Sequence, residues 1–247
     1  MFPPIAVVPL LDTDLFSREK YWRFFGTTLL IIAVAVMVLF SPLAARDLAG
    51  NPAYGVNIQE VFWDLSAALA SLNPFTLLIA LGSNLWVMLR ATFVHRDAFH
   101  LLGNMVLVFA LGPSIEARLG RGKYLLIFFG TGVFAMAAMT IVFSSHSPGL
   151  ILEGASASAF GLAGAFFALR PRAKLAGMFL VGLSDWALPI PFSLPAKWLL
   201  GLLLACEIGR GLSQLELSML AHLAGFICGY LSVRITLSEA KAEEASL

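Results

Sequence analysis

Charged side chains are scarce in this chain of 247 residues, where Asp, Glu, Lys and Arg together make up 13%. Hydrophobic residues make up 59%, and the mean hydropathy is +0.87. A domain of this size with so little charge cannot cover its surface with polar groups, which excludes an ordinary water-soluble protein. The net charge of +1 offers no basic surface, so we expect no nucleic-acid partner.

Cysteine and histidine are also rare, with two and four residues respectively. Cys206 and Cys228 fall within long apolar runs, and we interpret them as small buried apolar side chains rather than as a disulfide. A metal centre is disfavoured, because His95 and His100 do not share a helix face and carboxylates are missing nearby. We therefore expect neither a metal nor another cofactor. The remaining two histidines are His146 and His222.

Long apolar runs are what the chain has instead, and a membrane-spanning helix needs about 20 such residues. Residues 58–72 place apolar side chains on one face, which predicts a helix in the membrane interface. Residues 74–94 are apolar but are interrupted by Gly82, Ser83, Asn84 and Arg90, so we interpret them as a loop packed on or into the outer half of the bilayer. We predict six spans, at residues 25–40, 100–115, 124–143, 156–169, 191–208 and 217–235.

Lysine and arginine are unevenly distributed in this six-span arrangement, and basic loops remain in the cytoplasm. Both termini are therefore predicted to be cytoplasmic, in what we expect to be a prokaryotic plasma (inner) membrane. A seventh span at residues 74–94 would destroy this asymmetry, which is the main reason to reject it. We predict an N-terminal segment at residues 1–24, a membrane domain at 25–237 and a polar tail at 238–247. The basic residues on the opposite side would be only Arg46, Arg90, Arg96 and Arg210.

Polar groups from three predicted spans meet near the outer membrane surface. His100 and Asn104 are four residues apart and so share a helix face. Ser156 begins the fourth span just after Gly154, and His222 lies about a turn and a half into the sixth. Ionisable residues inside membrane helices are costly, so they indicate a functional site. A hydroxyl and an imidazole can support covalent acyl transfer, and N–H groups at a helix start can bind an oxyanion.

Glycines on the fourth and sixth spans predict close helix packing. Gly161 and Gly164 lie on the fourth span, while His222, Gly225 and Gly229 follow the spacing i, i+3, i+7 on one face of the sixth. Small residues let helix backbones approach closely in membranes. Such packing would bring the imidazole within reach of the serine.

Four motifs occur in the chain in a fixed order and spacing: His95-x4-His100-Leu-Leu-Gly-Asn104-Met, Glu116-Ala-Arg118-Leu-Gly-Arg-Gly-Lys123, Gly154-Ala-Ser156-x3-Phe160-Gly161 and His222-Leu-Ala-Gly225-x3-Gly229. Together they resemble the motifs of the rhomboid intramembrane serine proteases. The resemblance extends from about residue 22 to residue 235 and implies an all-α membrane protein, a six-transmembrane-helix bundle with a membrane-associated first outer loop.

The resemblance also implies a role for each polar residue. Ser156 would be the nucleophile and His222 the general base, while His100, Asn104 and the serine backbone would stabilise the oxyanion. Phe160 would stack against the imidazole ring and hold it. The supporting glycines would be Gly154, Gly161, Gly225 and Gly229.

A Ser–His dyad without a third member is expected, because no acidic residue lies in a predicted span at a depth suited to orienting the imidazole. Glu207 lies near a predicted span end and Asp185 lies in a loop. Glu116 and Arg118 would lie at the cytoplasmic end of the second span, where we interpret them as structural.

Two positions depart from the family's usual pattern. Ala157 follows the nucleophile where glycine is usual, and its methyl group could crowd the helix contact or the oxyanion site. Trp86 matches a Trp-Arg pair of the first outer loop, but Val87 replaces the arginine. We expect the second change to affect loop packing more than chemistry.

Three functional classes follow from these residues. The first is an intramembrane serine endopeptidase that cleaves transmembrane protein substrates near the outer face through an acyl-enzyme. The second is a catalytically inactive rhomboid-like protein that binds membrane-protein clients, a reading that only Ala157 favours. The third is a transporter using His100 and His222, which would favour inverted repeats and more intramembrane acids than this chain has. The sequence does not fix the oligomeric state.

Overall fold

The computed structural model describes residues 5–12, 25–40, 56–145, 150–183, 186–214 and 217–245. This part of the chain is mostly helical, with two small antiparallel sheets. The helices are α2 (Phe25–Leu39), α3 (Ile58–Ala70), α4 (Pro74–Ala91), α5 (Ala98–Leu119), α6 (Arg121–Phe143), α7 (Ser156–Leu169), α8 (Ala196–Gln214) and α9 (Ser218–Ala245). The residues named above that lie outside the described ranges are Arg46, His146 and Asp185.

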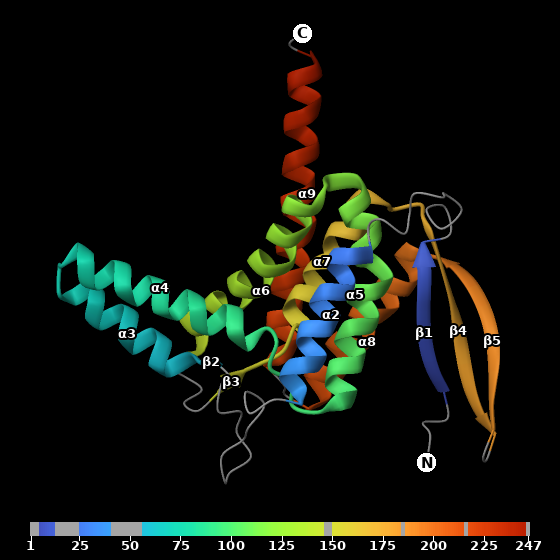
Figure 1. Ribbon diagram of the computed structural model, residues 1–247, viewed down its shortest axis with the longest axis horizontal. Coiled ribbons are helices and arrows are strands. Elements are labelled where there is room, and N and C mark those ends of the chain that lie inside the picture. Colours follow the sequence, from blue (N-terminus) through green and yellow to red (C-terminus); the bar gives the residue numbers. More distant parts are fainter. Residues whose placement is uncertain are drawn as a thin grey trace.

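Helix α7 lies at the centre of the bundle and is packed against α5, α6 and α9 (Figure 1). Every residue from Ala157 to Phe166 is buried, and most of these side chains are alanine or glycine. Small side chains allow neighbouring helices to approach closely, so the sequence of α7 explains its central position. The predicted bounds of this span agree with the helix.

Among the described residues, four helices are long and apolar enough to cross a membrane, and two shorter apolar helices, α2 and α7, accompany them. Many large apolar side chains of the bundle are exposed, for example Leu30 and Leu126. Such a surface is suited to lipid rather than water. The four long helices are α4, α5, α6 and the part of α9 up to Ser238.

The prediction that both cysteines are buried is wrong for Cys206, which is exposed on α8. Both thiols are free.

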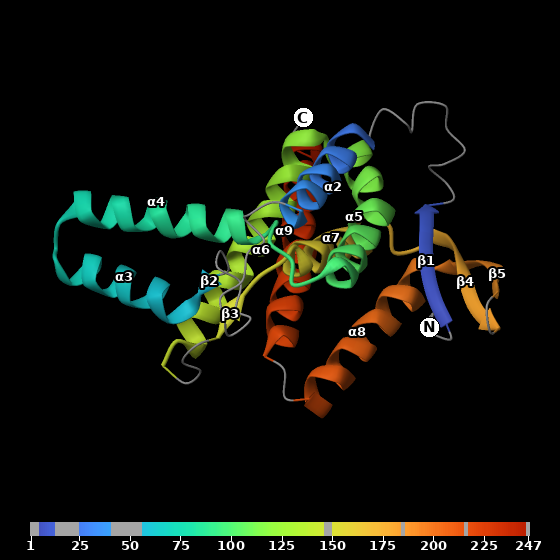
Figure 2. The same ribbon diagram turned by 60° about the horizontal axis from the view of Figure 1, so that its bottom comes forward.

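Helices α3 and α4 form a hairpin that projects from one side of the bundle, across the direction of α9 (Figures 1 and 2). The segment we interpreted as a loop is thus a continuous helix, despite Gly82, Ser83 and Asn84. The two polar residues do not break the helix, because their side chains form hydrogen bonds within it. Asn84 Nδ2 and Ser83 Oγ both donate to the carbonyl of Ala80, at 2.8 and 3.1 Å. Length and composition alone would allow α4 to span a membrane.

A three-stranded antiparallel sheet, which the sequence analysis did not anticipate, lies beside the bundle (Figure 2). Its strand order is β1 (Ile5–Asp12), β4 (Lys174–Leu183) and β5 (Trp186–Pro195). The predicted fifth span, at residues 191–208, is therefore wrong at its start, because helix α8 begins only at Ala196. Proline fixes an extended backbone in the residue before it and lacks an N–H group, which suits the edge strand β5. The prolines of β5 are Pro189, Pro191 and Pro195.

The structure adds regular elements near both ends of the chain. Strand β1 lies in the segment predicted as a separate N-terminal part, yet it pairs with β4. Helix α9 continues to Ala245, beyond the predicted start of a polar tail at residue 238. Alanine, glutamate and lysine dominate this extension, and all three favour helix even in a polar segment.

Candidate active site

The turn before α7 positions the candidate nucleophile. Gly154 has φ +92°, a conformation that residues with a side chain rarely adopt, and its N–H donates to the carbonyl of Ala91 at 2.9 Å. A Cβ at this position would also meet the His100 ring at 2.8 Å. Ser156 then begins α7, so its backbone N–H belongs to the first turn, where donors have no partner within the helix. The positive φ and the closeness of the His100 ring explain why residue 154 is a glycine.

The serine and the histidine that the sequence singled out are in contact. Ser156 Oγ and His222 Nε2 are 2.8 Å apart, although 66 residues separate them in the chain. The ring of Phe160 stacks on the imidazole with centroids 4.6 Å apart and an interplanar angle of 5°. This geometry is what a hydroxyl nucleophile and its general base require.

Close packing of α7 against α9 brings the two side chains together. A Cβ on Gly225 would collide with the carbonyl oxygen of Ala157, and a Cβ on Gly229 would collide with that of Gly161. Both obstacles are backbone atoms, which cannot move aside. The glycines therefore set the separation of the two helices, and with it the reach of His222.

Glu207 lies beside His222, contrary to the prediction that no acidic residue of a span lies at the depth of the imidazole. Its Oε1 lies 2.6 Å from His222 Nδ1, and the carboxylate comes from α8 rather than from the helices of the serine or the histidine. Arg210 Nη2 donates to the same oxygen at 2.8 Å. A signal was present in the sequence, since an acid and a base three residues apart within an apolar run mark an ionised pair.

His100 and Asn104 lie beside the Gly154 turn and line the same cavity as Ser156. The position that a Cβ on Gly154 would occupy is 3.2 Å from His100 Nε2 and 3.5 Å from Asn104 Nδ2. Asn104 Nδ2 is also buried and has no hydrogen-bond partner among the described residues. Buried donors are normally paired, so an unpaired amide N–H beside a nucleophile suggests an oxyanion site.

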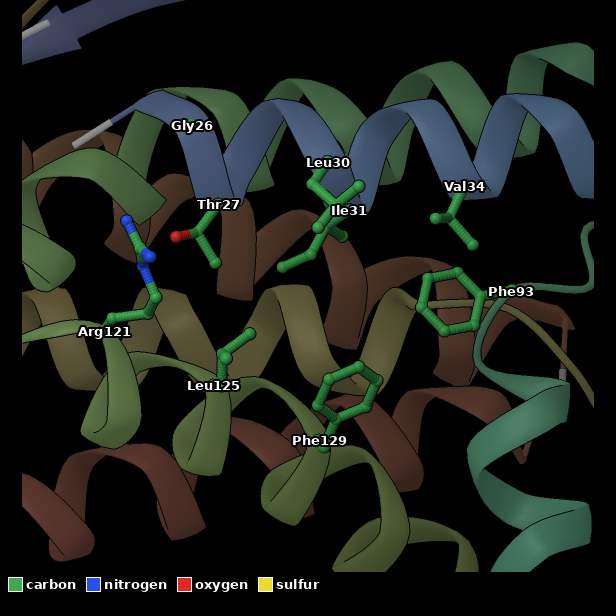
Figure 3. Close-up of a pocket in the computed structure, with 9 residues that line it drawn as sticks. All are labelled: Gly26, Thr27, Leu30, Ile31, Val34, Phe93, Arg121, Leu125 and Phe129. Carbon is green, nitrogen blue, oxygen red and sulfur yellow. The ribbon is translucent and has the colours of Figure 1, made fainter. Parts of the chain in front are cut away.

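One cavity of about 640 Å³ is lined by the polar side chains described above and by the ring of Phe160. These polar residues are His100, Asn104, Ser156, Glu207, Arg210 and His222. The cavity wall also includes Arg96 and Glu153, so the cavity is lined by charged groups of both signs. A separate groove of about 440 Å³ runs between α2 and α6 (Figure 3). That groove is apolar apart from Thr27 and Arg121 and contains no nucleophile with a base, so the chemistry belongs to the first cavity.

His95 anchors the turn before α7, which carries Ser156. Its Nδ1 donates to the Phe93 carbonyl at 3.0 Å, which leaves Nε2 to accept the N–H of Ala155 at 3.3 Å. A carbonyl can only accept, so this pairing requires the neutral ring with the proton on Nδ1. Burial lowers the pKa of His95, which favours that neutral form.

Lowering the pH below about 6.5, the ordinary pKa of histidine, is expected to destabilise the protein through His95. Below pH 6.5 the unfolded chain binds a proton at residue 95, whereas the lowered pKa of His95 keeps the folded protein unprotonated there. The contribution of His95 to the free energy of unfolding is therefore complete above about pH 6.5 and decreases as the pH falls. The loss cannot exceed about 1.4 kcal/mol per pH unit, the limit for one proton. The measurement is the unfolding temperature in detergent between pH 5 and 8 for wild type and His95→Gln. Parallel curves for the two proteins would contradict the assignment to His95.

Asp97 fixes the start of α5, the helix that carries both oxyanion candidates. Its carboxylate accepts the N–H of His100 at 2.8 Å as the helix N-cap. This hydrogen bond lowers the pKa of Asp97, so the cap remains charged at neutral pH. The direction of His100 and Asn104 is therefore set by the first turn of their helix.

The remaining sequence-predicted positions have structural surroundings. Ala157 is buried in an apolar cluster with Met88 and Ala221, which accommodates its methyl group. Val87 packs against the same cluster, whereas Trp86 is exposed on α4. Glu116 is buried, and its Oε1 accepts from Thr27 Oγ1 at 2.8 Å and from Arg121 Nε at 3.3 Å, as expected of a structural ion pair.

The apolar helices and the cavity together define a class: an integral membrane protein with a serine and a histidine in contact inside a helical bundle. The model of the rhomboid domain matches residues 82–239, which include all four motifs and both contacting residues. The chain belongs to the rhomboid family.

Two relatives are similar to more than half of the chain. A protein of Bacillus subtilis (strain 168), named as a candidate rhomboid protease, YdcA, is 24% identical over 147 residues, which are 59% of this chain and 64% of that protein. The rhomboid-like protease 2 of Toxoplasma gondii is 32% identical over 139 residues, which are 54% of this chain and 41% of that protein. The matched regions thus span less than two thirds of each relative.

Proposed function

We propose that the protein is an intramembrane serine endopeptidase that cleaves transmembrane segments of membrane proteins near the outer face. The observation that carries this proposal is the 2.8 Å contact between Ser156 Oγ and His222 Nε2 in a cavity that is also lined by Asn104, whose buried Nδ2 has no partner among the described residues. The names of both relatives, which call them rhomboid proteases, support the same activity.

The reaction would proceed through a covalent intermediate. Ser156 Oγ attacks the carbonyl carbon of the substrate peptide bond while His222 Nε2 accepts the hydroxyl proton. The developing oxyanion is stabilised by the side chains of His100 and Asn104 and by the backbone N–H of Ser156. When the C–N bond breaks, His222 returns the proton to the leaving amine. Water then takes the place of the serine as the nucleophile and attacks the acyl carbon while His222 Nε2 accepts its proton. The ester bond to Ser156 breaks, and His222 returns the proton to Ser156 Oγ.

The proposed site also constrains the substrate. A carbonyl in a regular helix is hydrogen-bonded and shielded, so a substrate helix must unwind before the serine can attack it. Segments with small or helix-weakening residues close to the outer surface are therefore the expected substrates. Water must enter the cavity for the second step, which is consistent with its polar lining.

A prokaryotic plasma membrane with both termini in the cytoplasm is the proposed setting. The turn between α5 and α6 and the end of α7 lie at the same end of the bundle as the C-terminus of α9 (Figure 1). These segments are basic, and basic segments favour the cytoplasmic side. Their basic residues are Arg118, Arg121, Lys123, Arg170, Arg172 and Lys174.

Reaction with a fluorophosphonate serine-hydrolase probe tests the proposed activity. We expect detergent-solubilised protein to form one adduct, and peptide mapping by mass spectrometry to place it on Ser156, because only an activated serine reacts readily. Heat-denatured protein is the control, since its serines have lost their base. An intact fold without an adduct would instead favour the inactive, client-binding class, and an adduct on another serine would mean a different nucleophile.

A further inference from the structure

The contact between α8 and α9 places a carboxylate behind the proposed general base. Glu207 Oε1 is 2.6 Å from His222 Nδ1, while His222 Nε2 is 2.8 Å from Ser156 Oγ. The side chains of Glu207 and His222 are each only 10% exposed, so this hydrogen bond is shielded from water. The three residues come from three different helices, so the packing of α7, α8 and α9 together aligns the three side chains.

We propose that Glu207 is a positioning residue that orients His222 and fixes its tautomer, so that the site works as a Ser–His–Glu arrangement rather than as a dyad. This inference rests on the proposed proteolytic function. A carboxylate can only accept, so His222 Nδ1 carries the proton and Nε2 is left free to accept the Ser156 hydroxyl proton. The carboxylate also stabilises the imidazolium that forms when the proton moves.

The stack with Phe160 cannot supply this orientation by itself. Rings 4.6 Å apart at an interplanar angle of 5° hold the plane of the imidazole, but a half-turn about the Cβ–Cγ bond would preserve the stack while exchanging each nitrogen with a ring carbon. The stack therefore does not ensure that Nε2 faces the serine. The charge and the direction of the Glu207 hydrogen bond make that selection.

Arg210 makes an ionised Glu207 tolerable inside an apolar helix. Its guanidinium donates to the same carboxylate oxygen at 2.8 Å and is itself 42% exposed, so the positive charge remains hydrated. The charged and titratable groups that line the cavity around His222 are Glu207 and Arg210 from α8, Arg96 and His100 from the start of α5, and Glu153 before α7.

The rate of fluorophosphonate labelling as a function of pH tests the inference. Glu207→Gln keeps the size of the side chain but removes its charge, so we expect labelling at neutral pH to slow at least roughly tenfold. The acid limb of the profile should move to lower pH, because the imidazolium has lost the anion that stabilised it. Asp64→Asn, the same change at an exposed site on α3, should alter neither the rate nor the profile.

Chemical rescue separates positioning from mere structural support. Glu207→Ala leaves space beside His222, and we expect sodium formate to restore part of the labelling rate while sodium chloride at equal ionic strength does not. Glu207→Asp, which keeps the charge on a shorter side chain, should label faster than Glu207→Gln. Unfolding temperatures in detergent establish which variants are folded. If Glu207→Ala does not fold, the labelling rate and pH profile of Glu207→Gln alone decide whether Glu207 positions His222.

The outcomes distinguish this inference from the proposed function. Wild-type rate and profile in Glu207→Gln would overturn the inference and leave a working Ser–His dyad, provided that His222→Ala no longer labels. Loss of labelling in Glu207→Ala that formate does not restore would also count against positioning. No labelling of Ser156 in folded wild type would overturn the proposed function, and the role of Glu207 with it.

Discussion

Replacing Ser156 with alanine is expected to abolish fluorophosphonate labelling and to lower the rate of peptide-bond cleavage by roughly ten-thousand-fold or more. The substitution removes the only oxygen within hydrogen-bonding distance of His222 Nε2 that the structure shows, among the residues it describes. His222→Ala should have an effect of similar size, because an unactivated serine hydroxyl is a weak nucleophile. The double variant should be no slower than either single one, since the two residues act as a unit.

Cleavage can be measured with a single-span model substrate, carrying small residues and a proline at its outer end, in vesicles that also contain the protein. Ser158→Ala is the matched control, as it makes the same change two residues later on α7. Ser158 Oγ is buried and has no hydrogen-bond partner among the described residues, so its loss should leave activity within a factor of two or so. Activity that survives Ser156→Ala but not Ser158→Ala would contradict the assignment of the nucleophile.

The polar residues of the candidate site were readable from the sequence because helical spacing fixes which side chains share a face. His100 and Asn104 are one turn apart on α5, and Gly225 and Gly229 follow His222 on one face of α9. These relations are local, so they hold wherever the helices lie. The contacts between helices required the structure.

Glu207 was missed because the end of its helix was misplaced. A span that ends at residue 208 puts Glu207 in the last turn. Helix α8 instead begins after the prolines of β5 and runs from Ala196 to Gln214, so Glu207 lies near its middle. A shift of six residues at the end of the helix thus changed an apparently peripheral acid into a neighbour of the imidazole.

The sheet beside the bundle could not be predicted for a different reason. Strand β1 pairs with β4, some 170 residues further along the chain, with Ile5 opposite Val181 and Asp12 opposite Leu175. Both strands are apolar, and in a membrane protein short apolar runs are equally compatible with part of a span. Long-range pairing of this kind leaves no periodic signal in either strand alone.

Replacing Gly229 with alanine is expected to destabilise the protein by about 1–3 kcal/mol and to reduce activity by roughly a hundredfold. The new methyl group would collide with the carbonyl oxygen of Gly161, a backbone atom in the middle of α7. The helices must separate to relieve the collision, and His222, on the same face of α9, moves with them. A displacement of about 1 Å in a reacting group can by itself cost roughly a hundredfold in rate.

The sign of the stability change makes this prediction specific. In an open helical position glycine is less stable than alanine by about 0.5–1 kcal/mol, so a glycine-to-alanine change there stabilises. Gly201 on α8 is such a position, with nothing within 4 Å of a Cβ added to it. Unfolding temperatures in detergent should therefore rise for Gly201→Ala and fall for Gly229→Ala, with the rate of Ser156 labelling retained in the first and reduced roughly a hundredfold in the second. A stabilised and active Gly229→Ala protein would mean that α7 and α9 are further apart than the Ser156–His222 contact requires.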